Sequence, residues 1–265
     1  MNAQRIYALF LRQIILNTQS YGRWFGLFYW PTVDLLVWGT FSIFLNKAGG
    51  SEFNVFAYLF GSIIFLNFIW RVQQGIAVSF LEDVWSQNFI NLFASPLTLG
   101  EYVISLIATS IVKVIAAISV MALLAWVLYA FNVFVFGFYL IPFIFILFFL
   151  SLAIGFLGVS ITLRIGPSAE ALVWAMPAVL APLSGAFYPI TVLPAFWQKV
   201  ALLVPSTYVF DGMRQVVSVG AFRTDLLLMG GLLSLVYFVL AIIFLYRTYR
   251  AVLRSGLFAR FSASD

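Results

Sequence analysis

Residues 114–163, VIAAISVMALLAWVLYAFNVFVFGFYLIPFIFILFFLSLAIGFLGVSITL, form the longest charge-free run of the chain, bounded by Lys113 and Arg164. A helix that spans a bilayer needs about 20 mostly apolar residues. This run is therefore too long for one span and suits two. Asn132, Gly137 and Pro142 lie near its middle and supply the residue types that favour a turn. The run predicts a pair of membrane-spanning helices joined by a tight connection.

The composition of the whole chain agrees with a membrane protein. Of its 265 residues 64% are hydrophobic and 9% are charged, with a mean hydropathy of +1.08, whereas a soluble chain carries about 25% charged residues. The chain has no Cys and no His, which excludes thiolate nucleophiles, Ser-His-Asp triads and most zinc sites. With only 14 Lys and Arg residues, we interpret the net charge of +5 as a topology signal rather than a nucleic-acid footprint.

The remaining charge-free runs complete the predicted fold. We expect an all-α integral membrane protein that forms a single transmembrane domain over residues 1–265. The six predicted spans cover roughly residues 25–46, 54–80, 103–130, 139–163, 171–190 and 225–246.

The basic residues predict the orientation of the chain, because cytoplasmic loops carry an excess of Lys and Arg. One group comprises Arg5, Arg12, Arg23, Arg164, Arg247, Arg250, Arg254 and Arg260. The opposite side would carry Lys47, Lys199, Arg214 and Arg223. Both termini are therefore predicted to be cytoplasmic, as an even number of spans requires.

The N-terminal residues 1–23 have the pattern of a helix lying in the cytoplasmic membrane interface. Apolar side chains recur there at helical spacing, at Tyr7, Phe10, Leu11, Ile14 and Ile15. Flanking arginines suit such a position. The alternative is that the first span simply starts early.

A cytoplasmic segment at residues 82–97 separates the second and third predicted spans. Trp85, Phe89 and Leu92 share one helical face, and Ser95-Pro96 ends the helix. The other candidate contact residues are Glu82, Asp83 and Phe93. Such a short amphipathic helix suits docking into a groove of a soluble partner. It could equally rest on lipid headgroups, although its acidic residues count mildly against an anionic leaflet.

Five prolines between positions 177 and 205 interrupt the chain beyond the fifth span. A continuous helix does not accept this density. We expect the fifth helix to end near Tyr188, followed over residues 189–215 by short apolar helices that dip into the outer leaflet. The residues of this outer segment that we single out are Tyr188, Pro189, Pro194, Trp197, Pro205, Tyr208, Asp211 and Arg214. The alternative, an ordinary outer loop, fits the apolar composition poorly.

Ionisable residues within the spans are costly and suggest function. Asp34 and Arg71 lie at similar depths on adjacent antiparallel spans, which predicts an ion pair. A proton relay would need a chain of titratable groups that is not visible. Lys113 has two open roles: contact with an anionic ligand, or snorkelling and pairing with Glu101 or Glu170.

The C-terminal pattern resembles the membrane subunit of type-2 ATP-binding-cassette exporters, the family that moves O-antigen, capsule and teichoic-acid chains, drugs and other amphiphiles. The most specific part comprises Pro182-Leu-Ser-Gly185, Tyr188-Pro189, Leu193-Pro194, Pro205, Tyr208 and Asp211-Gly-Met-Arg214. The segment from Glu82-Asp83 to Pro96-Leu97 is similar to the family's coupling helix. The outer segment would correspond to the family's re-entrant helices.

This resemblance implies a permease in a bacterial plasma membrane that exports an amphipathic or lipid-linked substrate, either a glycan or a drug-like molecule. The permease would pair with a second copy of itself and with two copies of a cytoplasmic ATPase. It would be no enzyme and hold no cofactor, because ATP and Mg would bind the partner; the sequence contains no phosphate-binding loop and no Gly-Lys pair. The alternative is an ion-gradient-driven secondary transporter or channel, although the halves show no internal repeat. An intramembrane enzyme is a weaker third possibility.

Overall fold

The computed structural model describes residues 1–49, 55–88, 92, 95–220 and 224–255. Helices dominate these residues, and no strand occurs among them. The α-helices are α1 (Ala3–Thr18), α2 (Tyr21–Gly49), α3 (Val55–Trp85), α5 (Leu99–Tyr129), α6 (Leu140–Ile165), α7 (Glu170–Leu183), α8 (Ala195–Ala201), α9 (Pro205–Val219) and α10 (Thr224–Ser255). Short 3-10 helices cover Val133–Tyr139, Gly166–Ala169 and Ile190–Val192. The all-α membrane fold is confirmed.

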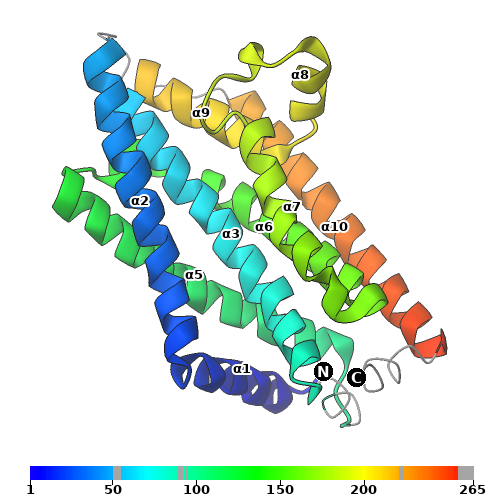
Figure 1. The fold of residues 1–265 in the computed structure, drawn as a ribbon. Helices are drawn as coiled ribbons and strands as arrows, with labels where there is room; N and C mark the ends of the chain where they lie inside the picture. The colour runs from blue at the N-terminus through cyan, green and yellow to red at the C-terminus, as the bar shows by residue number, and fades with distance from the viewer. Residues whose placement is uncertain (50–54, 89–91, 93–94, 221–223, 256–265) are drawn as a thin grey trace.

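By length and composition, five helical segments of the described chain can cross a membrane. They are Phe28–Lys47, Phe56–Trp85, Leu99–Tyr129, Val133–Leu183 and Thr224–Ser255. The segment Val133–Leu183 has 51 residues and contains both α6 and α7. The chain reverses between these helices at Gly166, whose φ of 64° favours glycine, so the segment contains two antiparallel helices (Figure 1).

The fifth predicted span extended too far at its C-terminal end. Helix α7 has 14 residues and ends at Leu183, not near Tyr188. At a rise of 1.5 Å per residue it measures about 21 Å, which is less than a bilayer's hydrocarbon core. The helix tolerates Pro177 and Pro182 in its interior. It stops where Gly185 takes a positive φ of 71°.

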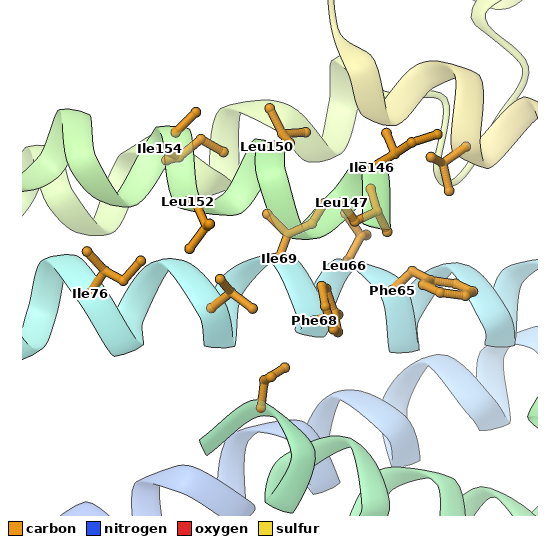
Figure 2. Packing of buried hydrophobic residues seen from close by; sticks show 14 of the residues in the cluster. Phe65, Leu66, Phe68, Ile69, Ile76, Ile146, Leu147, Leu150, Leu152 and Ile154 are labelled. Carbon is orange, nitrogen blue, oxygen red and sulfur yellow. The ribbon is translucent and has the colours of Figure 1, made fainter. Parts of the chain in front are cut away.

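Helix α3 is the centre of the fold. Its apolar side chains pack against α6, as Figure 2 shows for Phe65, Ile69 and Ile76 of α3 and Leu147 and Leu150 of α6. On another side α3 approaches α5 so closely that a Cβ on Gly75 would lie 2.5 Å from Cβ of Ser110. Small residues permit this approach, as they do at many helix contacts in membranes.

The outer helix α10 packs on α6 and leaves a broad apolar surface. Leu228, for example, is 75% exposed. The other exposed apolar side chains of α10 include Leu232, Leu235, Val236, Val239 and Leu240. Surrounding lipid, rather than water, accounts for such a surface.

The two ends of the bundle carry different helices. Figure 1 shows α1, the turn between α6 and α7, and the C-terminal part of α10 at one end, with α8 and α9 at the other. Arg12, Arg164 and Arg250 therefore share an end, while Lys199 and Arg214 belong to the opposite end. This is the grouping that the orientation prediction used; Arg223 and Arg260 lie outside the described residues.

The N-terminal residues form a helix of their own rather than an early start of the first span. The chain leaves helical structure at Ser20, and α1 lies at a steep angle to α2. Leu9 and Gln13 of α1 face the bundle and are buried. Tyr7, Leu11 and Ile15 lie on an exposed apolar stripe, as expected of a helix that meets lipid.

Candidate functional site

A cavity of about 800 Å³ lies among α2, α3, α5 and α7. The three ionisable residues singled out within the predicted spans line it, namely Asp34, Arg71 and Lys113. The cavity also reaches Glu82 and Trp85 at the end of α3. Small-molecule sites typically occupy about 300–1,000 Å³, so this volume suits a ligand of moderate size.

One face of α3 supplies most of the polar lining. Asn67, Arg71, Gln74, Ser79 and Glu82 all line the cavity. Their spacings of three to five residues keep them near one side of the helix. Together they form a polar track, which we define as these five residues, running from the middle of α3 towards its C-terminal end.

Asp34 and Arg71 share the cavity and attract each other electrostatically, but they do not make the direct ion-pair contact that was predicted. Oδ2 of Asp34 accepts a hydrogen bond from Nδ2 of Asn67 at 3.2 Å. Nη1 of Arg71 donates to Oε1 of Gln74 at 3.2 Å. No ion pair joins Asp34 to Arg71 among the contacts of the described residues. Similar depth on adjacent helices does not fix how each helix is rotated about its axis.

Lys113 reaches across from α5 to the polar track. Its Nζ donates a hydrogen bond to Oγ of Ser79 at 3.0 Å. The predicted partner Glu101 is instead held by Arg5 and by the backbone N–H groups of Asn2, before α1, and Thr98, before α5. Glu170 is exposed at the start of α7. Lys113 therefore contributes a positive charge to the cavity wall.

Tryptophan side chains surround the polar track. Five of the eight tryptophans of the chain line the cavity: Trp30, Trp38, Trp70, Trp85 and Trp174. Trp38 stacks on Phe187, with ring centroids 4.6 Å apart and planes 15° apart. The cavity thus combines flat aromatic faces with charged and amide side chains.

Asp83 is a buried junction rather than a docking residue, which corrects its predicted role. It is 2% exposed. Oδ1 forms an ion pair with Nη2 of Arg12 at 2.7 Å. Oδ2 accepts hydrogen bonds from Nε2 of Gln13 at 3.1 Å and from the Tyr102 hydroxyl at 2.6 Å. Asp83 therefore ties the end of α3 to α1 and α5.

Of the other residues predicted in the cytoplasmic segment, the structure describes Glu82, Trp85 and Leu92. Trp85 is 43% exposed, and Leu92 packs partly buried against the core. Glu82 faces the cavity. Phe89 and Phe93 lie outside the described residues.

A second junction lies where this segment enters α5. Thr98 and Glu101 form a capping box that satisfies the first backbone N–H groups of the helix. The same Glu101 accepts from the backbone N–H of Asn2 at 2.7 Å, and Arg5 donates to the carbonyl of Pro96. Both ends of the segment are therefore bonded to α1.

At the opposite end of the bundle, Arg214 anchors α9. Its Nη2 donates to the Tyr58 hydroxyl at 2.5 Å and to the Gly185 carbonyl at 2.9 Å. The guanidinium carbon lies 4.4 Å from the Tyr58 ring centroid. The Tyr58 hydroxyl donates to the same carbonyl. One arginine thus connects α9 to α3 and to the end of α7.

The remaining predicted residues of the outer segment shape its short helices. Pro189 and Pro194 precede the helices Ile190–Val192 and α8, and Pro205 opens α9. Proline is tolerated at these positions because the backbone N–H that it lacks has no partner within the helix at its start. The hydroxyls of Tyr188 and Tyr208 donate to the carbonyls of Pro182 and Leu202. Asp211 accepts from Arg214 at 3.3 Å, and Trp197 is exposed.

Sequence reasoning missed several residues that the structure brings together. The amides Asn67 and Gln74 lie at i−4 and i+3 from Arg71, a spacing that could have revealed the polar track. Tyr58 and Tyr102 carry no comparable local signal, because their partners are distant in sequence. No cluster of three or more metal-binding side chains occurs in the part of the chain that the structure describes.

Comparison with known proteins adds one finding. The model of the family described as ABC-2 type transporter matches residues 4–217. No curated protein matches the chain. The matched range includes the cavity, the Asp83 junction and the Arg214 contacts.

Proposed function

We propose that this chain, which belongs to the ABC-2 type transporter family as a membrane permease subunit, exports an amphipathic or lipid-linked substrate using ATP hydrolysed by a separate subunit. The family match over residues 4–217 is the observation that carries the proposal. In this proposal two copies of the chain and two ATPase subunits form the working complex. The membrane would be a bacterial plasma membrane, with both termini of the chain in the cytoplasm.

The segment at residues 82–97 is the proposed contact with the ATPase. It joins α3 to α5 at the same end of the bundle as α1. Exposed Trp85 offers an apolar anchor there. An aromatic side chain that enters a pocket of a partner is a frequent source of binding energy.

The buried junctions at Asp83 and Glu101 connect this contact mechanically to the helices of the membrane domain. A displacement of the segment reaches α3 and α1 through Asp83, and α5 through Tyr102 and Glu101. Because α3 carries the polar track, its movement alters the cavity directly. ATP binding to the partner would favour one arrangement over another through its differential affinity for the two states.

The contacts of Arg214 support a role for the outer segment as the exit of the path. They hold α9 against α3, while the short helices Ile190–Val192 and α8 extend between α7 and α9. Irregular backbone at membrane depth is tolerated where protein buries it or where it borders a cavity. Rearrangement of this segment would open the path outward.

Substitution of Trp85 by alanine tests the coupling. We expect the variant to lose co-purification with the ATPase as well as transport, because the anchor residue is removed. Co-purification separates this loss from any change in the cavity, which Trp85 also lines. Trp126→Ala is the matched control, because Trp126 of α5 is 64% exposed and belongs neither to the cavity lining nor to the outer segment. Intact export by the Trp85 variant, measured in proteoliposomes that contain the ATPase, would show that the contact is misassigned.

A further inference from the structure

We propose that a groove between α6 and α10 binds an anionic phospholipid of the bilayer, with an acyl chain along the groove and the phosphate at Arg164 and Arg247. The groove has a volume of about 460 Å³ and shares no lining residue with the cavity among α2, α3, α5 and α7. The inference goes beyond the proposed function, because it concerns a resident lipid rather than the cargo or the ATPase.

Two helices that run in the same direction form the groove. Both α6 and α10 lead towards the end of the bundle that carries α1 (Figure 1). Spacings of three or four residues keep the lining side chains on one face of each helix. Ala153 and Ala241 are each 2% exposed, so short side chains form the floor between the helices. The walls comprise Leu150, Ile154 and Leu157 of α6 and Tyr237, Leu240, Ile243 and Phe244 of α10.

The groove is apolar along its length and charged at one end. Leu240 and Phe244 are 55% and 37% exposed and belong to the apolar surface of α10 that lipid surrounds. Arg247, the last lining residue along α10, is the charged residue of the lining. A phospholipid has the same division, because its chains are apolar and its phosphate lies at one end. The surrounding bilayer supplies this ligand at high concentration.

Two arginines place positive charge at that end of the groove. Arg247 follows Phe244 by three residues on α10. The guanidinium carbon of Arg164 lies 5.3 Å from the centroid of the Phe244 ring, so Arg164 reaches the same place from α6. Neither arginine forms an ion pair or a hydrogen bond with another of the described residues. Guanidinium groups bind phosphate oxygens through paired donors, which makes a phosphate the fitting ligand.

The charge around the groove favours an anionic headgroup over a zwitterionic one. Residues 150–165 and 237–255 contain no Asp or Glu, but they include Arg164, Arg247, Arg250 and Arg254. Glu170, at the start of α7, forms no ion pair with Arg164 among the described residues. An anionic lipid therefore relieves repulsion between cations, whereas a choline group adds another cation. Each basic residue near an anionic lipid surface contributes about fivefold to binding.

Lipid binding to the purified chain tests the site without ATPase or cargo. The delipidated full chain in dodecyl maltoside is titrated with dioleoylphosphatidylglycerol, and native mass spectrometry counts the bound lipids. Dioleoylphosphatidylcholine has the same chains but no net charge, and glycerol 3-phosphate has the anion without the chains. We expect one phosphatidylglycerol per chain to bind at least about tenfold more tightly than either comparison ligand.

Charge variants assign this preference to the end of the groove. Arg247→Gln should lower the affinity for phosphatidylglycerol by about five- to tenfold, and should lower that for phosphatidylcholine less. Arg250→Gln is the matched control on the same helix. Arg250 does not line the groove, and its Nη2 donates to the Tyr246 hydroxyl at 2.7 Å.

A second pair of variants tests the apolar part of the groove. Leu157→Trp places a larger side chain in the α6 wall and should weaken the binding of both lipids, because less of the chain fits. Ile144→Trp is its control, since Ile144 is 41% exposed on α6 and does not line the groove. Thermal unfolding verifies the fold, and Arg247→Gln decides the result if Leu157→Trp does not fold.

Three results would overturn the inference: equal binding of the two lipids, equal binding of glycerol 3-phosphate and phosphatidylglycerol, or equal losses in the Arg247 and Arg250 variants. The alternative occupant of the groove is a second copy of the chain. Loss of the dimer in Leu157→Trp with unchanged lipid binding would assign the groove to that contact instead. None of these results affects the proposed function, which the reconstituted transport assay tests separately.

Discussion

Oδ1 of Asp83 lies 2.7 Å from Nη2 of Arg12, so an ion pair between a buried carboxylate and a partly exposed guanidinium joins the end of α3 to the N-terminal helix. The same carboxylate accepts from Gln13 and Tyr102. Burial of a charge is unfavourable unless it is paired and hydrogen-bonded. The three donors meet this requirement and make the junction a rigid connection between α1, α3 and α5.

Removal of the carboxylate should therefore destabilise the protein strongly. We expect Asp83→Ala to lower the free energy of unfolding by about 3–5 kcal/mol, because it leaves Arg12 charged without its partner. Asp83→Asn keeps an acceptor for Tyr102 and should cost less, about 1–3 kcal/mol. Unfolding in detergent micelles measures both values. Glu170→Gln, an exposed acidic position, should stay within about 1 kcal/mol; an equal loss there would contradict the assignment.

The contact between Arg214 and Tyr58 should be energetically coupled. A double-mutant cycle with Arg214→Lys and Tyr58→Phe is expected to give an interaction energy of about 1–2 kcal/mol, because the partly buried, charge-assisted hydrogen bond between the guanidinium and the hydroxyl is lost while a cation and a ring remain. Arg250 and Tyr246 form the matched pair, with the same guanidinium-to-ring distance of 4.4 Å but on an exposed surface. Their cycle should give about 0.5 kcal/mol. Equal values for the two pairs would show that burial of the outer contact contributes nothing.

The proposed orientation is testable by cysteine labelling, since the chain has no native Cys. A membrane-impermeant maleimide applied to intact cells should label Lys199→Cys on α8. It should label Arg250→Cys on α10 and Glu170→Cys on α7 only after permeabilisation. These positions lie at opposite ends of the bundle. Labelling of Arg250→Cys in intact cells would reverse the assignment.

Hydropathy and charge predicted the all-α membrane fold with its long apolar helices, because lipid imposes the same requirement on every span. They did not predict the residues at which the helices end. Helix α10 continues through Arg247, Arg250 and Arg254 to Ser255, since charges at an interface do not stop a helix. Likewise α3 continues beyond residue 80 to Trp85, because Asp83 is paired inside the protein rather than exposed.

Prediction of the site was partial for a related reason. Asp34, Arg71 and Lys113 were recognised as unusual within the spans, and all three line one cavity. Their partners depend on the rotation and tilt of packed helices, which local sequence does not specify. Asp34 therefore bonds to Asn67, and Lys113 to Ser79. The tryptophans of the cavity come from α2, α3 and α7, so only the folded structure brings them together.

The central claim is that an ATPase subunit supplies the energy for transport by this chain. The most direct measurement is accumulation of a substrate against its gradient in proteoliposomes, with and without the ATPase and with and without an ion gradient. We predict uphill movement that requires both the ATPase and ATP hydrolysis. Sustained uphill movement by the chain alone, driven by an ion gradient, would contradict the claim.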